Sequence, residues 1–157
     1  PFLYRHSRAQ INANPELKKV DYENAKKAAK RFSRNPSTAF SFAEGTRFTM
    51  QKHASQRSPY SNLLKPKVGA LAIALSGMPQ VNALLDFTVI YSSEKRSTWD
   101  FLCGDLNKVK VVARKYVLPE NLKNRSFEEE DDYRKSFQKF VDSIWLDKQQ
   151  TMKNLKF

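Results

Sequence analysis

The residues of this chain best suited to chemistry are four consecutive ones, Glu44-Gly45-Thr46-Arg47, in a sequence of 157 residues. They supply a carboxylate, a glycine, a hydroxyl and a guanidinium without a gap. Glycine permits a turn with positive φ and lets a ligand come close to the backbone. The arginine fork of donors suits bidentate contacts with phosphate. The four residues therefore predict a loop that binds a phosphate.

The segment before this loop has the pattern of an extended strand. Phe40 and Phe42 alternate with small residues over positions 38–43, which is the period of two expected of a strand. The strand would end at the loop and position it. A simpler alternative is a turn at the end of the strand, in which Glu44 and Arg47 form a surface ion pair.

The motif and its surroundings resemble the Glu-Gly-Thr-Arg block of the glycerophospholipid (lysophosphatidic acid) acyltransferase family. Lys52-His53 and the run Asn62-Leu63-Leu64-Lys65-Pro66-Lys67 follow it and lead into a small apolar segment. This order is similar to that of a bacterial, membrane-associated branch of the family, and the likeness extends through most of the chain.

The resemblance implies an activity in phospholipid biosynthesis. A fatty acyl group would pass from acyl-CoA or acyl carrier protein to the hydroxyl of a lysophospholipid of the 1-acyl-glycerol-3-phosphate type. Glu44, Gly45, Thr46 and Arg47 would bind the acceptor phosphate, and no cofactor or metal is implied. In the family a further arginine, N-terminal to this block, helps to hold the phosphate. Arg5 or Arg8 is the candidate for that role here, and a solvated basic loop is the alternative.

The family's chemistry also depends on a His-x-x-x-x-Asp motif, whose histidine is the general base and whose aspartate orients the imidazole. Five residues after His6 stands Ile11, and five after His53 stands Ser58, so neither histidine fits. The motif would lie N-terminal to the Glu-Gly-Thr-Arg block. We therefore expect residues 1–157 to be the C-terminal part of a single acyltransferase domain, truncated at the N-terminus and inactive alone.

The charge is concentrated in the first half of the chain. Residues 1–77 hold 14 Lys/Arg against 4 Asp/Glu, whereas residues 78–157 hold 14 against 12. This balance predicts a polyanionic partner, such as an anionic membrane surface or a phosphorylated substrate. The resemblance implies the cytoplasmic face of the inner membrane, with the anchor in sequence upstream, because no apolar run here approaches the roughly 18 residues needed to span a bilayer.

A basic nucleic-acid-binding module without catalysis is the competing interpretation. A net charge of +12 supports it. No recognised nucleic-acid-binding motif occurs in the sequence, and the aromatic residues fall at spacings typical of a core. The sequence also lacks zinc-binding Cys/His pairs, a Walker loop and a Gly-x-Ser-x-Gly elbow. The lone Cys103 excludes an internal disulfide, and we expect it to be a packed thiol.

The remaining elements predict an α/β fold with helices flanking a sheet, similar to glycerol-3-phosphate acyltransferases. Further strands are expected at 84–91, covered on both faces, and at 108–117, at a half-exposed edge. Helices are expected at 21–33, 69–76 and 127–150. Residues 50–62, which include His53, are expected to form a polar loop, and Trp99-Asp100-Phe101-Leu102 a packed connection.

Two of these helices have clear signals at their ends. Asp21 is the expected N-cap of the first, and its stripe of alanines, Ala25, Ala28 and Ala29, predicts close packing on the sheet. Its basic opposite face could contact lipid head groups or simply be solvated. Ser126 and Glu129 form the expected capping box of the last helix. The apolar face of that helix comprises Phe137, Phe140, Val141, Ile144 and Trp145.

Overall fold

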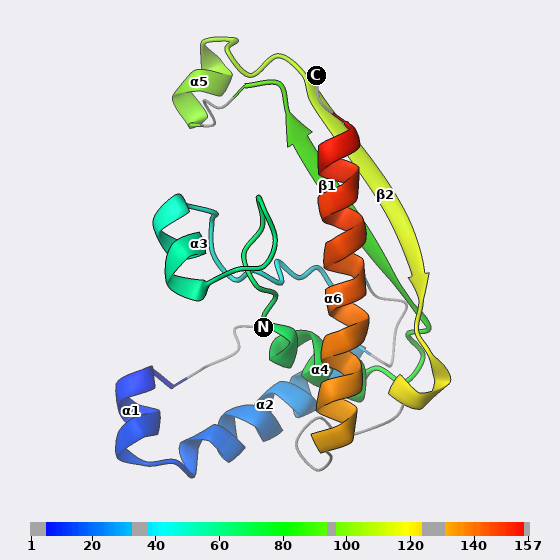
Figure 1. Ribbon diagram of the computed structural model, residues 1–157. Coiled ribbons are helices and arrows are strands. Elements are labelled where there is room, and N and C mark those ends of the chain that lie inside the picture. Colours follow the sequence, from blue (N-terminus) through cyan, green and yellow to red (C-terminus); the bar gives the residue numbers. More distant parts are fainter. Residues whose placement is uncertain (1–5, 33–37, 94–96, 124–130, 156–157) are drawn as a thin grey trace. The chain divides into compact units, whose positions relative to one another are not determined.

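The chain has a mixed α/β fold with a two-stranded antiparallel sheet and several helices, as seen in a computed structural model that describes residues 6–32, 38–93, 97–123 and 131–155 (Figure 1). The chain divides into two compact units. The first comprises residues 1–47, 66–82 and 118–141, and the second comprises residues 48–65, 83–117 and 142–157.

The elements of the first unit are helical. They are α1 (Arg8–Ala13), α2 (Leu17–Phe32), α4 (Val68–Gly77), the 3-10 helix η1 (Glu120–Leu122) and the N-terminal part of α6 (Asp131–Asn154). The second unit contains α3 (Met50–Gln56), β1 (Ala83–Tyr91), α5 (Thr98–Leu102), β2 (Val109–Val117) and the C-terminal part of α6.

Helices α2 and α4 pack closely because small residues meet where they cross. A Cβ atom added to Gly77 would lie 2.3 Å from the Cβ of Ala29, and Ala29 is buried. Only a glycine fits opposite the alanine at this distance. The predicted alanine stripe therefore does pack closely, but on a helix, and the prediction that it packs on a sheet is wrong.

Helix α2 begins earlier than the sequence pattern indicated. It starts at Leu17, so Asp21 lies inside the helix and is not its N-cap. The Asp21 carboxylate instead accepts a hydrogen bond from the backbone N–H of His6 at 3.0 Å. The prediction followed the capping preference of aspartate, which a more distant partner has overridden.

The predicted strand at 38–43 does not form. These residues are an irregular segment that ends in a turn at Ala43 and Glu44. A strand needs a neighbour to bond its backbone groups, and the sheet of the described residues contains only β1 and β2. Alternation of side chains is useful only when one face is buried, yet Phe40 and Phe42 are 84% and 93% exposed.

The predicted long helix near the C-terminus is present as α6, which ends at Asn154. In its first-unit part, Tyr133, Phe137 and Val141 are almost completely buried, and the Tyr133 hydroxyl donates to the Leu122 carbonyl at 3.3 Å. Of the predicted apolar face, Phe137, Val141, Ile144 and Trp145 are confirmed as buried, whereas Phe140 is only half-buried. The predicted capping residues, Ser126 and Glu129, lie outside the described residues.

The second unit is built on a hairpin in which β1 and β2 pair from Ala83 opposite Val117 to Tyr91 opposite Val109 (Figure 1). Both strands were predicted at these positions, and β2 is more exposed than the half-exposed strand that was expected, since only Val112 and Tyr116 are partly covered. The expectation that β1 is covered on both faces is wrong, since Leu85 and Phe87 are 61% and 47% exposed.

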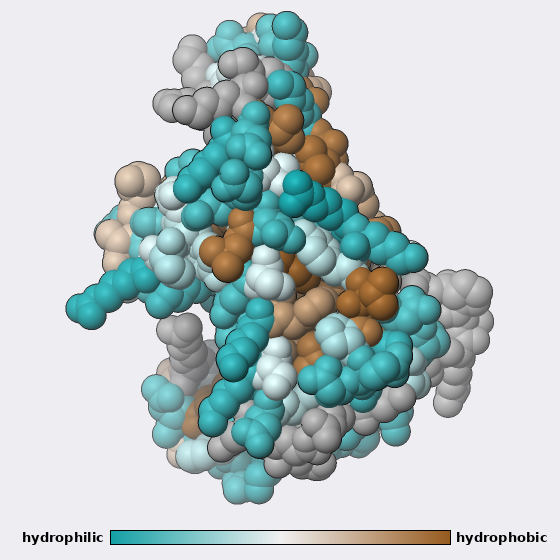
Figure 2. Space-filling model, turned by 45° about the vertical axis from the view of Figure 1, so that its right-hand side comes forward, coloured by the Kyte–Doolittle hydropathy of each residue, from teal (hydrophilic) through white to brown (hydrophobic). Residues whose placement is uncertain are grey.

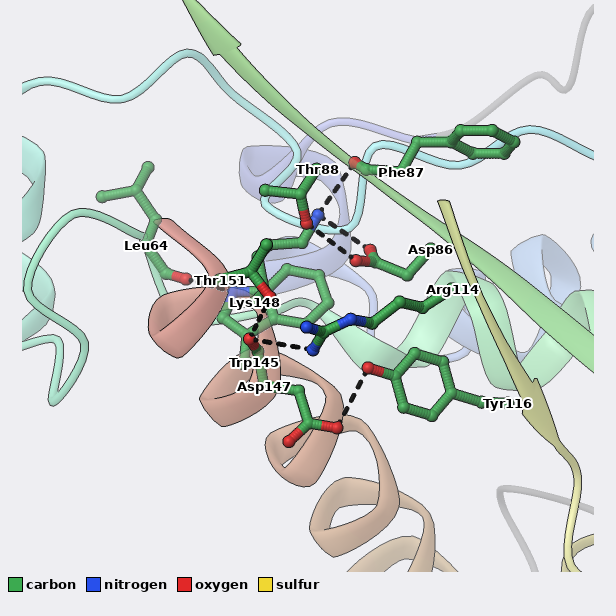
Figure 3. A network of polar contacts seen from close by, with 10 residues as sticks. All are labelled: Leu64, Asp86, Phe87, Thr88, Arg114, Tyr116, Trp145, Asp147, Lys148 and Thr151. Carbon is green, nitrogen blue, oxygen red and sulfur yellow. Dashed lines mark hydrogen bonds and ion pairs between the residues drawn. The ribbon is translucent and has the colours of Figure 1, made fainter. Parts of the chain in front are cut away.

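Polar contacts join the more buried face of the hairpin to α6 (Figure 3). The Lys148 ammonium lies 2.8 Å from the Asp86 carboxylate and donates to the Phe87 carbonyl at 3.0 Å. The Tyr116 hydroxyl donates to the Asp147 carboxylate at 3.0 Å. Since Lys148 and Asp86 are 13% and 14% exposed, water screens this ion pair only weakly.

The predicted environments of His53, Trp99 and Cys103 are wrong. His53 lies in α3, which begins at its N-cap Thr49 and has no buried residue. Helix α3 was not predicted because its sequence has no repeated large apolar residues at helical spacing. Trp99 lies in α5 and is 72% exposed, so the predicted packed connection is an exposed helix. Cys103, at the end of α5, is also exposed and is not a packed thiol.

The second unit also contains a buried phenol that makes its stability depend on pH. The Tyr60 hydroxyl donates to the Asp142 carboxylate at 2.9 Å, and burial, reinforced by Asp142, raises the pKa of Tyr60 from 10.0 to about 12. The unfolded chain therefore loses this proton at lower pH than the folded one. We expect the free energy of unfolding to fall as pH rises through this interval.

Chemical denaturation measured at a series of alkaline pH values tests this expectation. The Tyr60→Phe variant is the control, because it keeps the ring and removes the titrating group. An alkaline loss of stability of equal size in Tyr60→Phe and in the parent chain would contradict the assignment to Tyr60.

Candidate functional site

The loop predicted to bind phosphate is a tight turn held by backbone hydrogen bonds. The Gly45 N–H donates to the Phe42 carbonyl at 2.8 Å, and Gly45 has a φ of 67°. The predicted need for glycine at a positive φ is therefore confirmed. Gly45, Thr46 and Arg47 are exposed, and Glu44 is half-buried.

A lysine distant in sequence lies against this turn. The Lys67 N–H donates to the Ala43 carbonyl at 2.7 Å. A Cβ atom added to Gly45 would lie 3.1 Å from the Lys67 Cδ and 3.2 Å from its Nζ. The glycine thus serves two purposes, since it permits the turn and it leaves room for the lysine side chain.

Lys67 also stands at the start of a helix. It is the N-cap of α4, and its own side chain makes no capping hydrogen bond. The first N–H groups of a helix point outward and carry partial positive charge, which favours anions. The turn and Lys67 together bring an ammonium group and a helix N-terminus next to the predicted phosphate-binding loop.

Lys67 was not predicted to belong to the site, because nothing in the local sequence links it to Gly45. A signal was available, however, in the sequence Lys65-Pro66-Lys67. Proline disfavours the helical conformation in the residue before it, so a helix that starts directly after Pro66 places the second lysine at its N-terminus. Of the predicted arginines, Arg5 lies outside the described residues, as does the side chain of Arg8.

The structure also contains a histidine–aspartate pair that the sequence spacing did not reveal. His6 Nδ1 lies 2.6 Å from the Asp21 carboxylate, and both side chains are mostly buried. The pair is separated by fifteen residues and does not match His-x-x-x-x-Asp. Because Asp21 binds both the ring and the backbone of His6, it fixes the start of α1 to α2.

The second histidine has a backbone partner. His53 Nε2 lies 2.6 Å from the Tyr60 carbonyl oxygen, which accepts a hydrogen bond from the Nε2–H group, and the ring contacts Phe48. An imidazole that donates Nε2–H to a carbonyl cannot use that nitrogen as a base. Within the described ranges, no group of three or more His, Cys, Asp and Glu side chains could hold a metal ion.

No helix in the described part of the chain is long and apolar enough to cross a membrane. Comparison with known proteins gives no family either: no family model, no curated protein and no solved structure matches this chain.

Proposed function

We propose that this chain is the C-terminal part of a glycerophospholipid acyltransferase, and that the loop from Glu44 to Arg47 binds the phosphate of a lysophospholipid acceptor. The observation that carries the proposal is the close approach of Lys67 to Gly45. Lys67 adds a second cation to the loop that the resemblance assigns to phosphate binding. It does so beside Gly45, which has no side chain to keep a ligand from the backbone.

The arrangement suits a phosphate monoester for three reasons. The side chain of Arg47 can bind two phosphate oxygens at once. The ammonium of Lys67 adds a compact positive charge, and the N-terminus of α4 adds N–H donors. The exposed loop leaves room for a substrate with a bulky lipid tail. A phosphate held in this way would position the glycerol hydroxyl for attack on the thioester.

The remaining parts of the reaction would come from outside this chain. A base takes the proton of the acceptor hydroxyl, the oxygen attacks the thioester carbonyl of acyl-CoA or acyl carrier protein, and the thiolate leaves. The family's His-x-x-x-x-Asp motif would supply that base. In an acyl-transfer assay we therefore expect this chain alone to show only background turnover.

Two histidine variants test whether a catalytic base lies within this chain. Turnover above background that His53→Ala or His6→Ala abolishes would show that a base lies within the chain and that the proposed division is wrong. Melting temperatures of both variants should be recorded, because His6 also holds α1 to α2.

Phosphate binding can be tested without catalysis. We expect sn-glycerol 3-phosphate to shift the amide resonances of residues 43–47 and 67–69, and we expect glycerol to leave them unchanged. Shifts spread over the basic surface of the whole chain, or equal shifts with both ligands, would contradict a phosphate site at this loop.

A further inference from the structure

The hairpin of the second unit has its apolar face on the outside. In the register of β1 and β2, alternate positions point to the same side. One side carries the exposed apolar residues, which are 39% to 68% exposed. They are Leu85, Phe87, Val89, Val109, Val111 and Val117. The other side carries Asp86 and Tyr116, which bind α6 (Figure 3).

The connection between the two strands also carries exposed apolar residues. Trp99, Phe101 and Leu102 of α5 are 72%, 62% and 67% exposed, and we call these three residues the hairpin tip. On the face seen in Figure 2, hydrophobic residues, in brown, lie exposed among hydrophilic ones. Three large apolar side chains exposed on one short helix mark an interaction surface.

Local hydrogen bonds hold the tip in its shape without a core. The Ser97 hydroxyl accepts from the Asp100 N–H at 3.1 Å, and the Asp100 carboxylate accepts from the Ser97 N–H at 2.8 Å. This capping box fixes the first turn of α5. Local hydrogen bonds therefore hold this helix, and its three apolar side chains stay exposed because their burial is not needed to stabilise it.

We propose that the hairpin tip inserts into the interfacial region of an anionic lipid bilayer. A five-residue helix at the end of a hairpin is small beside the roughly 800 Å² per partner that a stable protein interface buries. Tryptophan, phenylalanine and leucine are the residues that enter the head-group region of a membrane. The tip fits this occupant better than a second protein.

Charge complementarity supports an anionic bilayer. Lys108, directly before β2, and Lys110, within it, follow the tip after Asp105, and both lysines are exposed. The segments of the second unit together hold 12 Lys/Arg against 6 Asp/Glu. Each base near an anionic surface adds to the attraction, and salt weakens it. The inference does not depend on the phosphate site, which is formed by residues of the first unit.

The two tryptophans of the chain allow a direct test. Trp99 is exposed, whereas Trp145 is 7% exposed and donates its indole N–H to the Leu64 carbonyl at 3.0 Å. Vesicles of phosphatidylcholine with phosphatidylserine should shift the emission of Trp99 to the blue. Acyl chains carrying bromine should quench it, with Trp145 unaffected. In Trp99→Phe both changes should vanish while binding persists.

Co-sedimentation with the same vesicles measures the affinity. We expect Phe101→Ser with Leu102→Ser to weaken binding by at least about tenfold, because two apolar side chains no longer enter the interface. Leu146→Ser is the matched control, since Leu146 is 57% exposed and lies on α6 of the same unit. It should bind like the parent chain, and all variants should keep its melting temperature.

Three results would overturn the proposal. The first is binding of the tip variant equal to that of Leu146→Ser. The second is equal binding to vesicles of phosphatidylcholine alone, which would remove the anionic surface as the partner. The third is self-association of the parent chain, seen in sedimentation without lipid and lost in the tip variant, which would identify a second copy as the occupant.

Discussion

Replacing Arg47 by lysine should weaken the binding of sn-glycerol 3-phosphate to this chain by about 10- to 150-fold. Lysine keeps the positive charge but loses the planar fork, so bidentate contact is lost while long-range attraction remains. Hydrogen bonds to charged groups contribute roughly 1.5–3 kcal/mol, and about 1.4 kcal/mol corresponds to a factor of ten in affinity. Titration followed by NMR gives the dissociation constants.

Arg57→Lys is the matched control for this measurement, because Arg57 is exposed and belongs to the second unit. Lys67→Met should also weaken binding, since Lys67 lies against Gly45. The competing explanation, a surface ion pair of Arg47 with Glu44, makes a different prediction. Such a pair contributes at most about 1 kcal/mol to stability, so unchanged affinity with a slightly lower melting temperature would exclude Arg47 from a phosphate site.

The second large effect concerns the ion pair between the hairpin and α6. We expect Lys148→Met to lower the free energy of unfolding by roughly 2–3 kcal/mol, because Asp86 would stay largely buried without its cation. That corresponds to a fall in melting temperature of roughly 5–10 °C for a chain of this size. Thermal and chemical denaturation measure both quantities.

Two further variants show whether the pair itself is responsible. Lys153→Met is the matched control, because Lys153 is exposed on the same helix, and it should change stability little. Asp86→Leu combined with Lys148→Met should recover much of the loss, since a buried ion pair can be replaced by apolar residues at little cost. Equal stability of Lys148→Met and Lys153→Met would show that the ion pair does not hold the hairpin to α6.

The elements that the sequence predicted well are those whose signals are contained within one segment. In α6, the spacing of Phe137, Val141 and Ile144 places all three on one face, whatever the rest of the chain does. The turn at Gly45 is equally local, because a positive φ depends on the residue itself.

Predictions that depended on a distant partner failed. Positions 38–43 have the alternation of a strand, but a strand also needs a neighbour, and alternation cannot supply one. In β1, the nearly continuous apolar run suggested burial on both faces. The sequence does not show that Asp86 would find Lys148 on α6, which turns the polar face inward and leaves Leu85 and Phe87 outside.

The candidate site also combines residues that the local sequence predicts with contacts that it does not predict. The four residues of the loop were identifiable from their types and order. Lys67 was not, because its proximity to Gly45 results from the bond between its N–H and the Ala43 carbonyl. The pairing of His6 with Asp21 is tertiary too, and no spacing rule for a catalytic dyad includes a separation of fifteen residues.

The interleaved order of the two units has a consequence for how the protein is made. Each unit consists of three separate segments of chain, and the last segment of each lies within the final forty residues. During synthesis, neither unit can close until α6 has left the ribosome. The hairpin must wait for Asp147 and Lys148 of α6, which are translated after it, and such waiting intermediates are prone to aggregate. We therefore expect chaperone dependence to be set by translation order. A truncation that removes all of α6 should prevent both units from folding, whereas a truncation directly after Val141 should remove only the last segment of the second unit.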